Sequence, residues 1–188
     1  MRQACFKLFL LADLVSTGSA SALTGAFEVS PRHYGTHVNR VLKKVEASIR
    51  FRLVVCDGGT VLECRFSSGH VTVRVQGQAN PPRTTRIIVK TDLLRDKPGA
   101  SPLDTVAEAM LALGATMVVF DPTLEAESRI EVLTDLSATA LDSGKGEGEG
   151  VEAQYSLTFD EAASGLLRMT VTPAERTGLD GLADLAVR

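Results

Sequence analysis

Three arginines, Arg52, Arg65 and Arg74, offer the clearest binding chemistry in this sequence. Apolar residues alternate with polar ones on both sides of Gly58-Gly59, which predicts a hairpin with a two-residue turn. The register that buries the apolar face sets Arg52 opposite Arg65 and places Arg74 beside Glu63 on the next strand. Opposed like charges cost stability unless something neutralises them. Because a guanidinium group binds carboxylate or phosphate through two hydrogen bonds, these arginines form a candidate anion site.

The negative charge that neutralises these arginines could come from the chain or from a partner. Residues 31–97 contain thirteen Lys and Arg against five Asp and Glu, whereas residues 98–188 contain five against sixteen. An acidic helix from the second half could therefore cover the arginines through Glu127, Glu131 or Asp135. The alternative is an acidic protein or an anionic envelope component. A nucleic-acid partner is not expected, because a chain with two Tyr and no Trp has few stacking platforms.

The histidines and the glycine-rich run do not complete the motif of a metal site, a hydrolase or a phosphate loop. His33 and His37 have the spacing of two metal ligands on one helix face, but no third ligand accompanies them, so no metal site is predicted. His70 with a serine and a carboxylate would suit a hydrolase, yet the chain has no Gly-x-Ser-x-Gly motif. The glycine-rich run 144–150 lacks the Lys-Ser/Thr ending of a phosphate loop. We therefore expect no cofactor and assign no catalytic residue.

Cys56 and Cys64 could form a disulfide in an exported protein, where an even cysteine count usually implies bridging. The hairpin register argues against it, because it sets Cys56 opposite Val61 and Cys64 opposite Leu53. The two thiols then point to opposite faces of the sheet, beyond bonding reach. We therefore predict that the cysteines are not bridged and that Cys64 is a small core residue.

Residues 1–22 have the features of an export signal. Arg2 and Lys7 are basic, residues 8–15 are mostly apolar, and Ala20-Ser21-Ala22 forms a small-residue cleavage site. The sequence therefore predicts a periplasmic or secreted protein without stable membrane insertion after cleavage. If the N-terminus is not cleaved, the alternative is a cytosolic protein.

The first half of the chain is expected to form one helix and four antiparallel strands. Ser30-Pro31 is a typical helix start, and apolar residues then recur at helical spacing as far as Ile49. Period-two alternation follows in three segments, and residues 84–91 supply a fourth strand. The apolar positions of the three alternating segments are Phe51, Leu53 and Val55, then Leu62, Cys64 and Phe66, then Val71, Val73 and Val75.

The second half is expected to add helices and a closing hairpin. Ser101-Pro102 begins a long helix that Asp121-Pro122 ends, although Gly114 before Met117–Phe120 could instead cap a helix and begin a buried strand. A shorter acidic helix follows over 125–136. Residues 142–150 are expected to be a flexible spacer, residues 152–159 and 166–172 two strands, and residues 174–188 a flexible or weakly helical tail.

These elements predict a single α+β domain over residues 23–173. Its sheet is a four-stranded antiparallel meander extended by a C-terminal hairpin, with two or three helices on one face. The order of elements resembles cystatin-like and secretion-chaperone-like domains in topology alone. We expect an exported, non-catalytic binding or envelope-support protein. The alternatives are a small envelope hydrolase and, without cleavage, a cytosolic adaptor of the secretion-chaperone type.

Overall fold

The structure is a computed structural model that describes residues 25–92, 101–160 and 165–174. The expected signal peptide over 1–22 lies outside these ranges. So do the segments 93–100, 161–164 and 175–188, which include all but the first residue of the expected tail.

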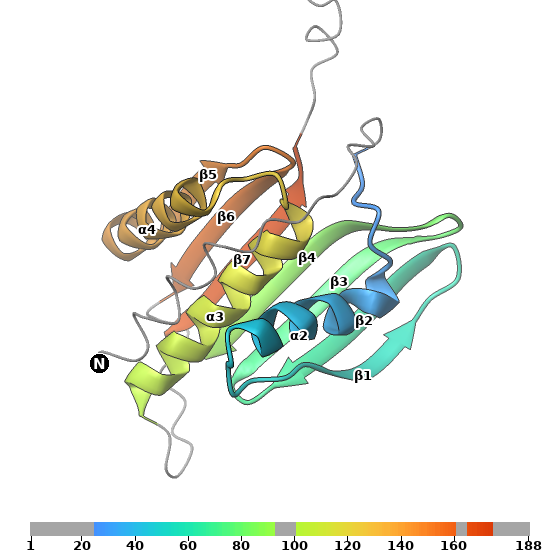
Figure 1. The fold of residues 1–188 in the computed structure, drawn as a ribbon, viewed down its shortest axis with the longest axis horizontal. Helices are drawn as coiled ribbons and strands as arrows, with labels where there is room; N and C mark the ends of the chain where they lie inside the picture. Colours follow the sequence, from blue (N-terminus) through green and yellow to red (C-terminus); the bar gives the residue numbers. More distant parts are fainter. Residues whose placement is uncertain (1–24, 93–100, 161–164, 175–188) are drawn as a thin grey trace, which may run out of the picture.

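The described strands form one antiparallel sheet of seven strands, which confirms the α+β class. The order across the sheet is β1-β2-β3-β4-β7-β6-β5, so the meander and the C-terminal strands join where β4 pairs with β7 (Figure 1). The strands are β1 (Arg52–Asp57), β2 (Val61–Ser68), β3 (Val71–Ala79), β4 (Pro82–Asp92), β5 (Lys145–Glu149), β6 (Ala153–Asp160) and β7 (Leu166–Pro173).

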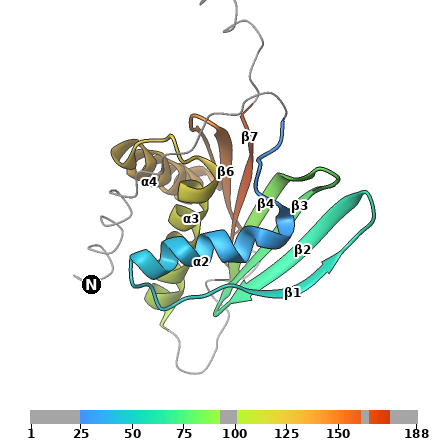
Figure 2. The ribbon, with the colours of Figure 1, turned by 45° about the vertical axis from the view of Figure 1, so that its right-hand side comes forward.

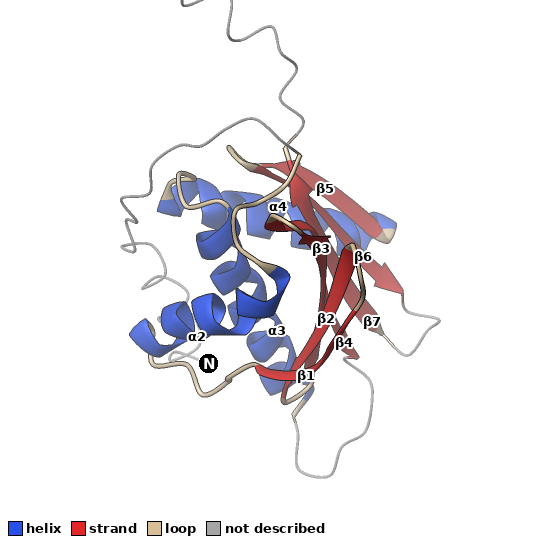
Figure 3. Cartoon of the chain, turned by 90° about the vertical axis from the view of Figure 1, so that its right-hand side faces the viewer, coloured by secondary structure: helices blue, strands red, loops and turns tan. Residues whose placement is uncertain are grey.

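The helices of the described ranges all lie on one face of this sheet, and none of them covers the opposite face, which we call the uncovered face (Figure 3). A short 3-10 turn, η2 (Pro31–His33), leads into α2 (Tyr34–Lys44). This helix ends earlier than the expected Ile49, and the buried Ala47 and Ile49 belong to the segment that leads to β1. The other helices are α3 (Pro102–Phe120) and α4 (Ala126–Ser143), which extends beyond the expected Leu136. Figure 2 shows α2 and α3 packed against each other over the β1–β4 half.

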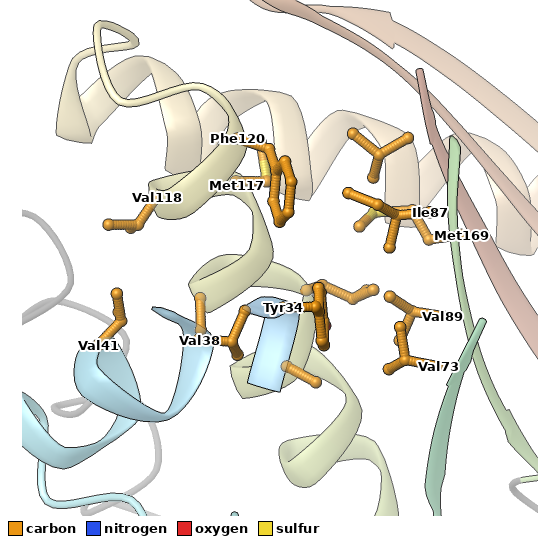
Figure 4. Close-up of a cluster of buried hydrophobic side chains, with 14 of the residues drawn as sticks. Tyr34, Val38, Val41, Val73, Ile87, Val89, Met117, Val118, Phe120 and Met169 are labelled. Carbon is orange, nitrogen blue, oxygen red and sulfur yellow. The ribbon is translucent and has the colours of Figure 1, made fainter. Parts of the chain in front are cut away.

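The core fills the space between the helices and the covered face of the sheet (Figure 4). Alternate residues of β2, β3, β4, β6 and β7 point into it, and for β2 and β3 this confirms the period-two pattern that the sequence predicted. Tyr34 is fully buried at its centre, stacked against Phe120 and edge-on to Phe51. Its hydroxyl shares a 2.9 Å hydrogen bond with Thr116, so the single polar atom of this ring is satisfied.

The segment Met117–Phe120 is helical, which resolves the alternative that the sequence left open. Ser101 caps α3 by accepting a hydrogen bond from the Leu103 backbone N–H, as its position before Pro102 predicted. Residues 103–120 are apolar and long enough to span a membrane. In this fold more than half of them are buried, and α3 is the central core helix.

The glycine-rich run forms the edge strand β5, so the expectation of a flexible spacer is wrong. Glycine and charged residues alternate in Lys-Gly-Glu-Gly-Glu. Gly146 and Gly148 face α4, whereas Lys145, Glu147 and Glu149 are exposed. Since α4 packs closely on this strand, only glycine leaves room for the helix backbone at Gly146.

The β1–β2 hairpin has a different register from the expected one. Cys56 pairs with Cys64 and Leu53 with Phe66, because the turn is longer than two residues and Val54 is an extra residue in β1. The structure joins Cys56 and Cys64 in a disulfide, so the prediction of unbridged cysteines is wrong. That prediction assumed a two-residue turn at Gly58-Gly59, whereas the ladder pairs Asp57 with Glu63.

We expect Cys56 and Cys64 to resist thiol labelling after denaturation without reductant and to be labelled together once reductant is added. Because the bridge closes a loop of eight residues, reduction should lower the free energy of unfolding by about 2 to 3 kcal/mol. Mass spectrometry of the labelled protein and urea unfolding measure the two effects. Labelling of both cysteines without reductant would contradict the bridge.

Candidate functional site

Four basic residues cross the uncovered face of the sheet, and we call them the basic stripe: Arg65, Arg74, Lys90 and Arg168. Arg65 on β2 pairs directly with Arg74 on β3, and Lys90 on β4 pairs with Arg168 on β7. Arg74 and Lys90 are diagonal neighbours, because β3 and β4 pair Thr72 with Lys90. The stripe therefore crosses four adjacent strands, roughly 14 Å at the usual spacing between strands of ~4.8 Å.

The structure brings together two of the three arginines that the sequence singled out. Arg65 and Arg74 face each other. Arg52, on the edge strand β1, pairs with Ser67 of β2, so the expected opposition of Arg52 and Arg65 is wrong. The pairing changes because the turn between Asp57 and Glu63 is longer than two residues, and the extra residue Val54 then sets Arg52 opposite Ser67. Arg74 contacts Glu63 as expected, with its Nε 3.2 Å from a carboxylate oxygen, but it does so diagonally, because the register pairs Glu63 with Gln76.

Lys90 and Arg168 were missed as stripe members because they lie on strands whose pairing the sequence did not fix. Lys90 occupies an outward position in the fourth strand and Arg168 an outward position in the last. The join of β4 to β7 sets them side by side. Strand alternation could have identified both as outward-facing residues, but the order of strands could not be read from the sequence.

The electrostatic environment of the stripe is strongly positive. Partial burial lowers the pKa of Lys90, and the charges of Arg168 and Arg74 lower it further. Glu63 forms an ion pair with Arg74, and Asp92 and Asp160 lie on the same face, each diagonal to Arg168. Four positive charges thus lie side by side across the sheet. Such an arrangement favours an anion that approaches from outside.

The acidic helix does not cover the arginines as the internal alternative required. Helix α4 packs on β5 and β6 from the opposite face of the sheet (Figure 3). Its Glu127, Glu131 and Asp135 are exposed on that side. The charge of the stripe is therefore not neutralised by these three carboxylates.

The surface around the stripe is polar and open. Toward β5 it contains a shallow hollow of about 440 Å³, whose lining includes acidic, amide and hydroxyl groups. The main side chains of this lining are Glu147, Glu149, Gln154, Ser156, Thr170 and Thr172. The uncovered face thus changes from basic at its centre to acidic at the β5 edge. A surface of this kind suits a partner with its own charge pattern better than a small molecule enclosed in a cleft.

A second polar cluster lies inside the protein, where α3 ends and α4 begins. The Asp121 carboxyl accepts hydrogen bonds of 3.0 Å from the backbone N–H groups of Val151 and Glu152 and from the Tyr155 hydroxyl. The Arg129 guanidinium donates to the Leu124 carbonyl oxygen at 2.6 Å. Burial raises the pKa of Asp121 and of Tyr155, although the hydrogen bonds to Asp121 oppose its shift.

This Asp121 cluster is closed to solvent and joins elements together. Asp121 has no exposed surface, and Arg129 and Tyr155 are almost completely buried. A substrate could not reach these groups in this conformation, so they hold the α3–α4 connection to the β5–β6 turn. From the sequence, Asp121 was expected only to mark the end of a helix. A single aspartate before a proline gives no signal of its buried partners.

The three histidines lie on α2 or next to it, and at the β2–β3 turn. His37 is half-buried on α2, where burial and the charges of Arg40 and His33 lower its pKa. In the described ranges, no three His, Cys, Asp or Glu side chains are grouped so as to hold a metal ion. At the β2–β3 turn, the backbone N–H of His70 lies 3.4 Å from Glu108.

Comparisons of this chain with protein-family models, with curated proteins and with solved structures find no match.

Proposed function

We propose that this is an exported, non-catalytic binding protein that holds an acidic protein partner on the basic stripe. The observation that carries the proposal is the open sheet face, where Arg65 pairs directly with Arg74 and Lys90 with Arg168. Opposed like charges lower the stability of a sheet, and these two pairs have no internal compensation from α4. An anionic partner would offset this repulsion between like charges.

An acidic protein fits this face better than an anionic envelope component such as a lipid surface. Glu63 lies beside the stripe, and Glu147 and Glu149 lie at the far edge of the same face. A planar anionic surface would meet these carboxylates as well as the stripe. A folded or extended protein partner can set its carboxylates on the stripe and its donors on the acidic edge.

Export is supported by the disulfide as well as by the character of residues 1–22. Disulfides persist in oxidising compartments and are rare in reducing ones. The bond between Cys56 and Cys64 therefore fits a periplasmic or secreted protein.

The double variant Arg65→Gln/Arg168→Gln tests the binding function, because it removes one member of each opposed pair and retains the Arg74–Glu63 ion pair. With fluorescent poly-L-glutamate as the probe, we expect affinity to fall roughly tenfold or more at low salt, and salt to weaken the wild-type complex. The free energy of unfolding should stay equal or rise by about 0.5 to 1 kcal/mol, because like-charge repulsion is relieved.

The matched control is Arg40→Gln/Lys43→Gln, which removes the same charge from the exposed face of α2. Equal loss of affinity in the control would show that net charge, and not the stripe, binds the probe. A large loss of stability in the stripe variant would assign these arginines to folding. Phosphatidylglycerol vesicles form a second arm, and tighter binding to vesicles than to poly-L-glutamate would replace the acidic protein with an anionic envelope component.

A further inference from the structure

The two edges of the sheet are protected very differently. At one edge, β5 carries a charge at every second residue and packs against α4. At the other edge, β1 pairs with β2 alone. Between Arg52 and Asp57 this strand contains only Leu53, Val54, Val55 and Cys56. Edge strands usually carry charges or proline in their centre, since an open apolar edge pairs readily with another strand.

The exposed apolar side chains of the described residues include two in the centre of this edge. Leu53 is 51% exposed and Val54 is 64% exposed. Leu53 lies on the covered side of the sheet, opposite Phe66, yet α2 does not shield it. An apolar surface of this kind on a strand with open hydrogen-bonding groups is typical of pairing between chains.

The charges at the ends of β1 are arranged for pairing with a second copy of the same strand. In an antiparallel pair about a two-fold axis, Arg52 of each copy faces Asp57 of the other, Leu53 faces Cys56, and Val54 faces Val55. Both ends then carry a pair of opposite charges. A parallel arrangement in the same register would set arginine against arginine and aspartate against aspartate.

The bulge at Val54 places the residues that would pair across the two-fold axis on the same face of the sheet. Arg52 and Asp57 are five residues apart, so in a regular strand they would point to opposite faces of the sheet. In this structure Arg52 pairs with Ser67 and Asp57 with Glu63, both on the uncovered face, because Val54 is an extra residue between them. Leu53 and Cys56 likewise share the other face. Two-fold pairing requires this agreement of faces.

We propose that two copies of this chain associate through antiparallel β1–β1 pairing, which joins their sheets into one continuous sheet. The two-fold axis is perpendicular to the sheet, so the helices of both copies lie on one side and both basic stripes lie on the other. The association does not depend on the proposed partner of the stripe.

The full chain is tested by analytical ultracentrifugation over a range of concentrations. We expect a dimer, and Val54→Lys should weaken dimerisation by roughly tenfold or more, since it places a charge in the centre of the paired edge. Val61→Lys is the matched control, because Val61 is 65% exposed but belongs to β2. A wild-type chain that stays monomeric at high micromolar concentration, or an equal effect of both variants, would overturn the proposal.

Charge reversal tests the register. Arg52→Asp alone and Asp57→Arg alone each place like charges opposite one another, so both should weaken the dimer. The double variant Arg52→Asp/Asp57→Arg restores opposite charges in a two-fold pair and should recover wild-type association. Failure of the double variant to recover, with thermal unfolding unchanged, would exclude this register. Poly-L-glutamate binding by the Val54→Lys variant separates this result from the function of the stripe.

Discussion

Asp121→Ala is expected to lower the free energy of unfolding by about 3 to 5 kcal/mol, the largest effect of any single substitution considered for this chain. The change removes the acceptor of three donors, the N–H groups of Val151 and Glu152 and the Tyr155 hydroxyl. Asp121 is completely buried, so water cannot replace the lost partner without opening the fold. Urea unfolding followed by circular dichroism measures the change.

Two further variants define the source of this effect. Tyr155→Phe removes one hydrogen bond to Asp121 and should cost about 1 kcal/mol. Asp121→Asn removes the titration and retains the shape of the side chain.

Burial raises the pKa of Asp121 above its ordinary 3.8, so the folded state binds the proton more tightly than the unfolded state. The stabilisation from this tighter proton binding is fully present below pH 3.8 and is lost as pH rises through the raised pKa of Asp121.

The pH profile of unfolding therefore has a defined sign. Relative to Asp121→Asn, the wild-type protein should lose stability as pH rises through the raised pKa of Asp121. Parallel pH profiles for the two proteins would contradict the raised pKa. A loss below 1 kcal/mol in Asp121→Ala would show that this cluster does not hold the helices to the sheet.

Gly146→Ala is expected to lower the free energy of unfolding by about 2 to 3 kcal/mol. A Cβ at this position would overlap the carbonyl oxygen of Leu136 and lie 3.1 Å from its carbonyl carbon and Cα. The atoms in the way belong to the backbone of α4, so the helix itself must move away from β5. Chemical denaturation with a near-ultraviolet probe of Tyr155 packing measures the loss.

Gly148→Ala is the matched control, since Gly148 lies on the same strand and faces the same helix. There a Cβ would lie 3.3 Å from a Val132 methyl group and 3.4 Å from the Leu136 side chain, both of which can shift slightly. We expect a change within about 0.5 kcal/mol. Equal and small effects at both glycines would mean that the run is the flexible spacer first expected.

The fold class could be predicted from the sequence because its strands and helices follow simple periodicities. Val71, Val73 and Val75 alternate without interruption, and Ser101-Pro102 marks the start of α3 with an ordinary cap. The β5 strand was missed because its inward residues are glycines, so no apolar alternation signals the buried face. Alternation of glycine with Lys145, Glu147 and Glu149 was the available signal.

The candidate site was predicted in part, because a site across a sheet depends on register and on strand order. Arg65 and Arg74 were identified as facing outward, and this is what alternation alone can determine. The turn, which is longer than two residues, brought Cys56 opposite Cys64 and moved Arg52 away from Arg65, and the extra residue Val54 then set Arg52 opposite Ser67. No local feature of Leu53-Val54-Val55 indicates the bulge. Strand order brought in Lys90 and Arg168, and it depends on contacts between residues about eighty positions apart.

Helix α3 follows β1–β4 in the chain and packs against β3 and β4 in the fold. Ribosomes synthesise α2 and β1–β4 before α3, so the surface that buries α3 can form before this apolar helix emerges. Until β7 is synthesised, however, β4 is a second open edge, and its partner lies at the far end of the chain. The nascent protein therefore passes through a stage in which Ile87 and Val89 belong to an unfinished sheet. Because β7 is synthesised last among the strands, a chaperone that covers the open edge of β4 would act at this stage.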